Sequence, residues 1–236
     1  MDAAGPSGTA AGGLFAPAAF AFLRGLRADN TKAWFEAHRA EYERNVKQPV
    51  ATLVAAVTTE LTRRGLPLEG DPKRSTFRIH RDTRFSKDKS PYKTTVGAVW
   101  HRQGSSKGGA GVLYFHLDPD GCFAAAAFYM PEPEALDALR ERIRVHPQRW
   151  AAVVETLAGS GLQVEGDALT RMPRGFEDLK DSPVAGAIRQ KSYVVRQDLP
   201  EVAVMGADLP GRIATLAASA LPLLQFGWAA VDEAAG

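Results

Sequence analysis

The sequence is poor in the residues that build covalent and metal-based sites. Cys122 is the only cysteine among 236 residues, which excludes an internal disulfide and a cysteine cluster for zinc or iron–sulfur. It lies in the small, apolar run 122–127, where buried packing is a simpler interpretation than a reactive thiol. His116 and Asp118 would supply only two metal ligands, so we expect no metal site.

Long apolar runs and nucleotide-binding signatures are also missing. No uninterrupted run reaches the roughly 18–20 apolar residues that span a bilayer. Residues 1–16 are rich in Ala and Gly without Lys or Arg, which predicts a disordered tail rather than a secretory signal. Neither G-x-x-x-x-G-K-[ST] nor a strand-linked G-x-G-x-x-G occurs, so we expect no cofactor. These absences favour a cytoplasmic protein that does not bind a membrane.

What is present is enough apolar sequence for one core. Hydrophobic residues make up 45% of the chain and charged residues 24%, as in ordinary soluble proteins. No linker or internal repeat divides residues 17–230, which we interpret as a single domain. Helical spacing of apolar residues, with proline and glycine at the ends, predicts helices over 17–27, 30–46, 50–65, 133–143, 147–159 and 209–228. We expect Asp29 or Asn30 to cap the second helix, Pro49 to interrupt it, and Pro222 to bend or break the last one.

Between the helical regions the apolar pattern changes to a period of two. This alternation predicts strands at 75–81, 95–102, 112–118, 122–130 and 191–196, with a further short candidate at 161–166. Short connections require antiparallel pairing. We therefore expect an α+β fold, in which helices from both ends of the chain cover an antiparallel sheet of about five or six strands.

Positive charge is concentrated in one part of the chain. Residues 73–107 contain ten Lys or Arg against two Asp, whereas the whole chain has a net charge of only +2. The central part, Arg78–Lys93, is called the basic segment below. Its arginine forks and lysine amines, with hydroxyls at Thr83, Ser86, Ser90, Thr94 and Thr95, are the donors that phosphate oxygens require. Phe85 and Tyr92 could stack on a planar group.

Some of these charges have a structural interpretation. Alternation along 75–81 places Arg81 on the buried side with Phe77 and Ile79, where it needs a carboxylate partner. Asp82 and Asp88 are the nearest candidates, and an ion-pair network with Arg84 would fix the loop. We favour an architectural role for Arg81 and Asp82. Two carboxylates cannot neutralise ten cations, so other cations must face solvent, an acidic partner or an anion.

The candidate ligand-binding residues follow from this excess. They are Arg78, Arg81, Asp82, Arg84, Ser86, Lys87, Asp88, Lys89, Tyr92 and Lys93, with Arg174 and Lys191 from later basic stretches. Arg174 and Lys191 would join the surface only if the last strand lies beside the first.

The run Phe77–Lys93 also supports a family resemblance. With Lys32-Ala-Trp-Phe35, Tyr129-Met-Pro131 and Arg171-Met-Pro-Arg-Gly-Phe176, it resembles the bacterial and fungal family called domain of unknown function 2461, whose hallmark looks like the FRIHRDTRFSKDKSPYKT present here. The resemblance implies no activity, cofactor or catalytic residue. Family members often carry His-Pro where this chain has Ser182-Pro183, so any role of that histidine is not transferred.

Three functions remain open from the sequence. The first is a domain that binds a phosphorylated or other anionic ligand, which could be a nucleotide, a metabolite or a nucleic-acid backbone. The second is an enzyme acting on an anionic small molecule, with Asp82, Asp88 or one of His80, His101 and His116 as the proton-transfer group. The third is a protein-interaction module with a basic face. The sequence does not specify the substrate or the oligomeric state.

Overall fold

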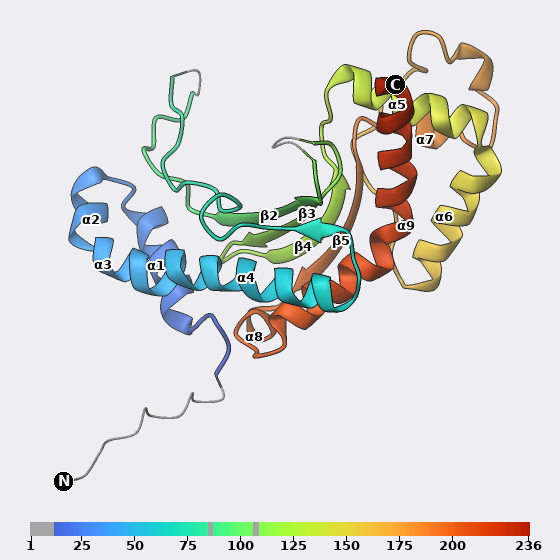
Figure 1. Ribbon diagram of the computed structural model, residues 1–236. Helices are drawn as coiled ribbons and strands as arrows, with labels where there is room; N and C mark the ends of the chain where they lie inside the picture. The colour runs from blue at the N-terminus through green and yellow to red at the C-terminus, as the bar shows by residue number, and fades with distance from the viewer. Residues whose placement is uncertain (1–11, 85–86, 106–108) are drawn as a thin grey trace.

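The computed structural model describes residues 12–84, 87–105 and 109–236, which form a single α+β domain (Figure 1). Its centre is a five-stranded antiparallel sheet with the strand order β1-β2-β3-β4-β5. The strands are β1 (Leu68–Glu69), β2 (Val96–Arg102), β3 (Val112–Leu117), β4 (Cys122–Phe128) and β5 (Tyr193–Leu199). The predicted fold class, antiparallel pairing and four of the predicted strands are confirmed, and β1 is a short strand that the alternation did not indicate.

Side-chain alternation gives the sheet one buried face. Trp100, Phe115 and Phe128 are at most 1% exposed. They face α4 (Gln48–Arg63) and α9 (Leu209–Ala235), which lie on the same side of the sheet in Figure 1. The Trp100 indole donates to a carbonyl of α4 at 3.3 Å. Gly227 of α9 approaches the Phe128 ring so closely that a Cβ there would lie 2.2 Å from it.

The opposite face of the sheet, called the open face below, is less covered. Gly97, Val99 and His101 of β2 share this face with Tyr114 and His116 of β3 because each strand alternates with a period of two. Phe123 of β4 and Arg196 of β5 continue the same face. Val99, His101, Tyr114, His116 and Phe123 are half-buried, and Arg196 is exposed, so this face keeps polar and aromatic groups within reach of solvent.

The segment predicted as the first strand is an irregular arm along the edge of β2. Isolated bridges join Thr76 to Ala98 and His80 to Tyr92. Between these bridges the arm runs four residues, from 76 to 80, whereas the facing chain runs six, from 92 to 98. The facing chain therefore contains a bulge of two extra residues. Thr76 is bridged to Ala98, whose side chain lies on the buried face, so the next residue of the arm emerges on the opposite face. Ile79 is buried as predicted, but Phe77, also predicted to be buried, is 46% exposed and lies toward the open face.

The predicted second helix is divided into several pieces. The N-terminal helices are α1 (Pro17–Ala28), α2 (Lys32–Ala37), α3 (Arg39–Tyr42) and a π-helical turn, η1 (Glu43–Lys47), that runs into α4. Pro49 does not break the chain of helices, because it lies in the first turn of α4, where a missing amide is tolerated. The cap of α2 is Thr31, whose hydroxyl accepts from the amide of Trp34 at 3.2 Å, and not Asp29 or Asn30.

Asn30 instead holds the basic segment against the helices. Its side-chain Nδ2 donates to the Tyr92 carbonyl at 3.0 Å, and its Oδ1 accepts from the Tyr92 amide at 3.1 Å. This two-point contact reproduces the pairing that a neighbouring strand would provide. The Tyr92 ring is 3% exposed and stacks on Phe35 of α2, with ring centroids 4.2 Å apart.

The C-terminal part of the chain covers one end of the sheet. It contains α5 (Pro133–Val145), α6 (Pro147–Gly159), the 3-10 turn η2 (Glu177–Leu179), α7 (Ala185–Arg189), α8 (Glu201–Val204) and α9. Figure 1 shows α9 changing direction part-way along, as predicted from Pro222, but the helix continues through it. The short strand predicted at 161–166 is only a single bridge between Glu165 and Val194.

Helix α9 is also apolar enough to be compared with a membrane span. An 18-residue window within Leu209–Ala235 has a mean hydropathy of 1.4. The expectation that no segment is long and apolar enough to span a membrane was therefore too broad. However, 61% of that window is buried within the protein. This is the arrangement of a core helix, and the cytoplasmic location stays a prediction.

Both ends of the domain extend beyond the predicted limits of 17 and 230. Phe15 is 2% exposed and packs near Phe115, so the end of the predicted tail belongs to the domain. At the other end, Asp232 of α9 accepts two hydrogen bonds from Arg102 of β2, both 2.8 Å long. The remainder of the predicted disordered tail, residues 1–11, lies outside the described residues.

The Asn30 contact can be tested by its effect on stability. Asn30→Ala removes two hydrogen bonds and leaves the partly buried backbone of Tyr92 unpaired. We expect the free energy of unfolding to fall by about 1–3 kcal/mol, measured by urea denaturation. Asp29→Ala is the matched control, since Asp29 is exposed, and should change it by less than about 0.5 kcal/mol. Equal effects of the two substitutions would contradict the anchoring role.

Candidate functional site

Two ion pairs hold the outer part of the basic segment. Arg81 donates through Nη1 to Asp88, and Arg84 forms a two-point contact with Asp82 at 2.7 and 3.0 Å. Of the two candidates predicted as the partner of Arg81, Asp88 is the one that pairs with it, and the predicted ion-pair network is present. Asp82 pairs with Arg84 because it lies two residues before Arg84 in a tight turn, where it also accepts from the Arg84 amide.

Both carboxylates in this network have lowered pKa values. Hydrogen bonds from the Ser90 hydroxyl at 2.6 Å and the Ser90 amide at 2.9 Å, with a smaller contribution from Arg81, lower the pKa of Asp88 to about 2. The Arg84 side chain and amide lower the pKa of Asp82. Both groups are therefore ionised near neutral pH and serve as acceptors for this loop.

These pairs leave an excess of cations. The basic segment contains six Lys or Arg and two Asp, and each Asp is paired with one arginine. Among the described residues, Arg78, Lys87, Lys89 and Lys93 have no carboxylate oxygen within 4.0 Å. Lys89 donates instead to the Thr83 carbonyl at 2.9 Å. Most of the segment's excess charge is thus free to face solvent or a ligand.

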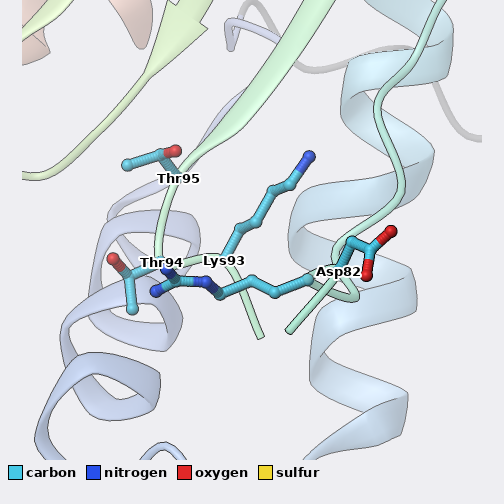
Figure 2. Close-up of a pocket in the computed structure, with 5 residues that line it drawn as sticks. Asp82, Lys93, Thr94 and Thr95 are labelled. Atoms are coloured by element: carbon cyan, nitrogen blue, oxygen red, sulfur yellow. The ribbon is translucent and has the colours of Figure 1, made fainter. Parts of the chain in front are cut away.

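One pocket lies where the inner part of this segment joins β2. It has a volume of about 390 Å³ and is lined by Arg81, Asp82, Lys93, Thr94 and Thr95. Thr94 and Thr95 belong to the two-residue bulge opposite the arm, so the bulge brings them to the pocket. Figure 2 shows the two threonines on one side and Asp82 on the other, with the Lys93 side chain extending between them. The pocket therefore combines cations with hydroxyl groups.

The pocket does not include every predicted ligand-binding residue. Arg78, Lys87 and Lys89 are exposed nearby in the sequence but do not line it. Tyr92, predicted to stack on a ligand, is buried against Phe35 and is a structural anchor. Ser86, together with Phe85, lies outside the described residues.

Arg174 and Lys191 were expected to join this surface if the last strand lay beside the first. The sheet order does not meet that condition. Lys191 precedes β5, which pairs with β4, and two strands separate β5 from β2. Neither residue lines the pocket.

A second group of polar and aromatic side chains lies on the open face. The Tyr114 hydroxyl is 3.0 Å from Nδ1 of His116, and His116 stacks on Phe123 at 4.7 Å between ring centroids. The Arg196 guanidinium lies 4.0 Å from the centre of the Phe123 ring. His116 was named in the sequence analysis only as a candidate proton-transfer group, and its hydrogen bond with Tyr114 was not predicted. Its sequence signal is the i, i+2 spacing of two polar rings on one strand face.

The environment of His116 shifts its titration. Burial lowers the pKa of His116, and Asp118, whose carboxylate is 3.7 Å from Nε2, partly opposes this effect. Burial also raises the pKa of the Tyr114 hydroxyl. Both rings are consequently neutral near pH 7, so each can donate or accept a hydrogen bond without carrying charge.

The three histidines considered for proton transfer do not converge. His80 packs near Phe35 and Tyr92, His116 lies on the open face, and burial lowers the pKa of His101 elsewhere on β2. Within the described parts of the chain, no three His, Cys, Asp or Glu side chains form a group that could hold a metal ion. Cys122 is buried, as expected, and burial raises the pKa of its thiol.

Comparison with known families bears on this site. Residues 18–226 match the model of the family described as conserved hypothetical protein, DUF2461. The chain belongs to the DUF2461 family. The match covers the sheet, the basic segment and the pocket, and it confirms the resemblance carried by the motif at 77–93. None of the proteins of curated function matches this member of the DUF2461 family. Function must therefore be argued from the site itself.

The two hydrogen bonds from Ser90 should control the pKa of Asp88. Ser90→Ala removes the hydroxyl donor, so we expect the pKa of Asp88 to rise from about 2 toward its ordinary value of 3.8. Because the folded-state pKa is lowered, the stabilisation from ionised Asp88 is present above the ordinary value and is lost as the pH falls. In the variant the stabilisation should be smaller, and its loss should be complete at a higher pH because the folded-state pKa is higher.

Carboxyl-carbon NMR titration of the full chain would measure this shift. The control is Ser105→Ala, because the Ser105 hydroxyl donates to the Arg102 carbonyl outside the basic segment. An unchanged Asp88 pKa in Ser90→Ala would show that the hydroxyl does not set it and would leave the Ser90 amide and Arg81 as its causes.

Proposed function

We propose that this protein binds a phosphate or similar oxyanion group of a ligand in the pocket formed by Arg81, Asp82, Lys93, Thr94 and Thr95. The observation that carries the proposal is the state of Lys93. It lines the pocket, it has no carboxylate oxygen within 4.0 Å among the described residues, and two hydroxyl-bearing residues adjoin it. An ammonium group and hydroxyl donors around one hollow match the needs of phosphate oxygens.

Arg81 supplies a second cation whose orientation is already restrained. One of its guanidinium nitrogens is engaged by Asp88, and its backbone amide donates to the Pro91 carbonyl at 2.9 Å. The remaining N–H groups of Arg81 stay available, since a guanidinium has five donors. Asp88 therefore positions Arg81 and also neutralises part of its charge. Because the Arg81 side chain is already oriented, it loses less conformational entropy when an anion binds.

The pocket also has a size suited to more than an ion. A volume of about 390 Å³ lies within the range of roughly 300–1,000 Å³ typical of small-molecule sites. The presence of Asp82 on one wall, paired with Arg84, would disfavour a ligand with negative charge on that side. We infer that one end of the ligand is anionic and that the rest extends out of the pocket.

The enzymatic alternative based on Asp82 or Asp88 is weakened by their hydrogen bonding. Both carboxylates have lowered pKa values, and an efficient general base or acid has a pKa near the working pH. They are better suited to holding arginines than to moving protons.

Binding of inorganic pyrophosphate to the full chain tests the proposal. Lys93→Ala removes the unpaired cation, so we expect affinity measured by calorimetry to fall by about 10- to 100-fold, as for loss of a charged hydrogen bond. Lys73→Ala is the matched control. Lys73 is exposed, precedes the arm and does not line the pocket, so its removal should leave affinity within about twofold.

Two results would overturn the proposal. One is no detectable pyrophosphate binding at low ionic strength, where weak charge interactions are least screened. The other is an equal loss in Lys73→Ala and Lys93→Ala, which would mean that the anion responds to overall charge and not to the pocket.

A further inference from the structure

The pocket is directly connected to an exposed aromatic ring. Lys93 lines the pocket, and its Nζ also lies 5.6 Å from the centre of the Phe77 ring. Phe77 is 46% exposed, which is unusual for a phenylalanine at the edge of a core sheet. An anion held by Lys93 would therefore have a large apolar ring beside it.

This ring begins a row that crosses the open face. Phe77 meets Tyr114 edge-to-face at 6.0 Å, Tyr114 contacts His116, and His116 stacks on Phe123. The arm, β3 and β4 thus contribute adjoining rings. Lys93 lies at one end of the row, and Arg196 lies over Phe123 at the other. Cations at both ends of an aromatic row are suited to a ligand that combines planar groups with negative charge.

The backbone is adapted to this row at Gly97. A Cβ on Gly97 would lie 2.6 Å from the Tyr114 hydroxyl and 2.8 Å from its ring, so only glycine lets Tyr114 lie across β2 toward Phe77. That position also brings the hydroxyl to His116. Because the hydroxyl and the imidazole are half-buried and neutral, they offer hydrogen-bonding groups beside an apolar surface.

We infer that the ligand is a nucleotide, with its phosphate in the pocket and its base against Phe77 and Tyr114 on the open face. This inference rests on the proposed anion site and adds the class of ligand. In a nucleotide a single sugar joins the phosphate to the base, so a phosphate beside Lys93 places the base within reach of the adjoining ring. An acidic peptide could fill the pocket with a carboxylate, but its aspartate and glutamate side chains carry no aromatic group for this surface.

Three ligands separate the parts of the inference. Pyrophosphate tests the pocket alone, ribose 5-phosphate adds the sugar, and adenosine monophosphate adds the base. We expect adenosine monophosphate to bind the full chain about five- to tenfold more tightly than ribose 5-phosphate, as for one base–aromatic stack. Phe77→Leu should bring the ratio of these two affinities close to one, since leucine keeps apolar bulk without an aromatic face.

The matched control is Tyr129→Leu. Tyr129 is 70% exposed, follows the end of β4 and makes no ring contact with the row, so its replacement should not change the adenosine monophosphate advantage. Thermal unfolding of each variant checks that the fold is intact. Equal binding of adenosine monophosphate and ribose 5-phosphate by the unaltered protein would overturn the nucleotide inference, while pyrophosphate binding would still support the pocket. Absence of binding by all three ligands would overturn both.

A short single-stranded oligonucleotide distinguishes a free nucleotide from a nucleic acid. Steep weakening with salt, at about 0.7 log units per log salt for each of several phosphates, would identify a strand as the source of the nucleotide. Binding no tighter than that of the monophosphate would identify a free nucleotide. A loss of oligonucleotide binding in Lys93→Ala but not in Phe77→Leu would contradict the role of the ring.

Discussion

The contact between Asn30 and the backbone of Tyr92 is the constraint on which the candidate site depends. The basic segment leaves the sheet after Ile79 and returns at Pro91, and like-charged side chains along it repel one another. Asn30 satisfies both the amide and the carbonyl of Tyr92, and Phe35 stacks on the Tyr92 ring. These contacts fix the returning chain at Tyr92, one residue before Lys93. Lys93, the pocket cation that neither Asp82 nor Asp88 neutralises, is therefore attached to a rigid part of the fold.

Charge compensation then divides the segment into two functional parts. Asp82 and Asp88 each engage one arginine, and the hydrogen bonds from Ser90 keep Asp88 ionised over nearly the whole accessible pH range. These exposed pairs add little to global stability, because solvent screens them. Their effect is local, since they set the direction of Arg81 and close the loop. Lys93, which neither carboxylate neutralises, remains as the charge that faces the pocket.

Much of the fold followed from periodicity, and the exceptions have identifiable causes. The strands at 96–102, 112–117 and 122–128 and the change of direction along α9 could be predicted because hydrophobic spacing and proline geometry are local properties. The orientation of Phe77 could not, because it depends on the register with β2. Thr76 pairs with Ala98 on the buried face, so Phe77 lies opposite Gly97 on the open face, and this pairing joins segments that are not adjacent in the sequence.

The pairing of arginines with aspartates in the basic segment also could not be predicted from the sequence, because it depends on how the chain folds back on itself. Composition alone established that cations would remain after Asp82 and Asp88 were paired, since charge balance does not depend on geometry. Which arginine met which aspartate depended on the turn at Asp82 and on the return of the chain at Pro91. Tyr92 was misassigned to the ligand because an aromatic residue in a polar loop has the same sequence signature whether it anchors the loop or faces outward.

The two-residue bulge opposite the arm, which the strand prediction did not include, also forms part of the site. A regular strand from 75 to 81 would have paired continuously with the facing chain, without the extra residues that line the pocket. The two extra residues bring Thr94 and Thr95 beside Lys93, and the pairing of Thr76 with Ala98 places Phe77 on the open face. Gly97 completes this arrangement, because the absence of a side chain lets Tyr114 reach across β2 to Phe77. An irregularity that weakens the sheet edge therefore joins a cationic pocket to an aromatic surface, and this junction is the physical reason to expect one ligand to occupy both.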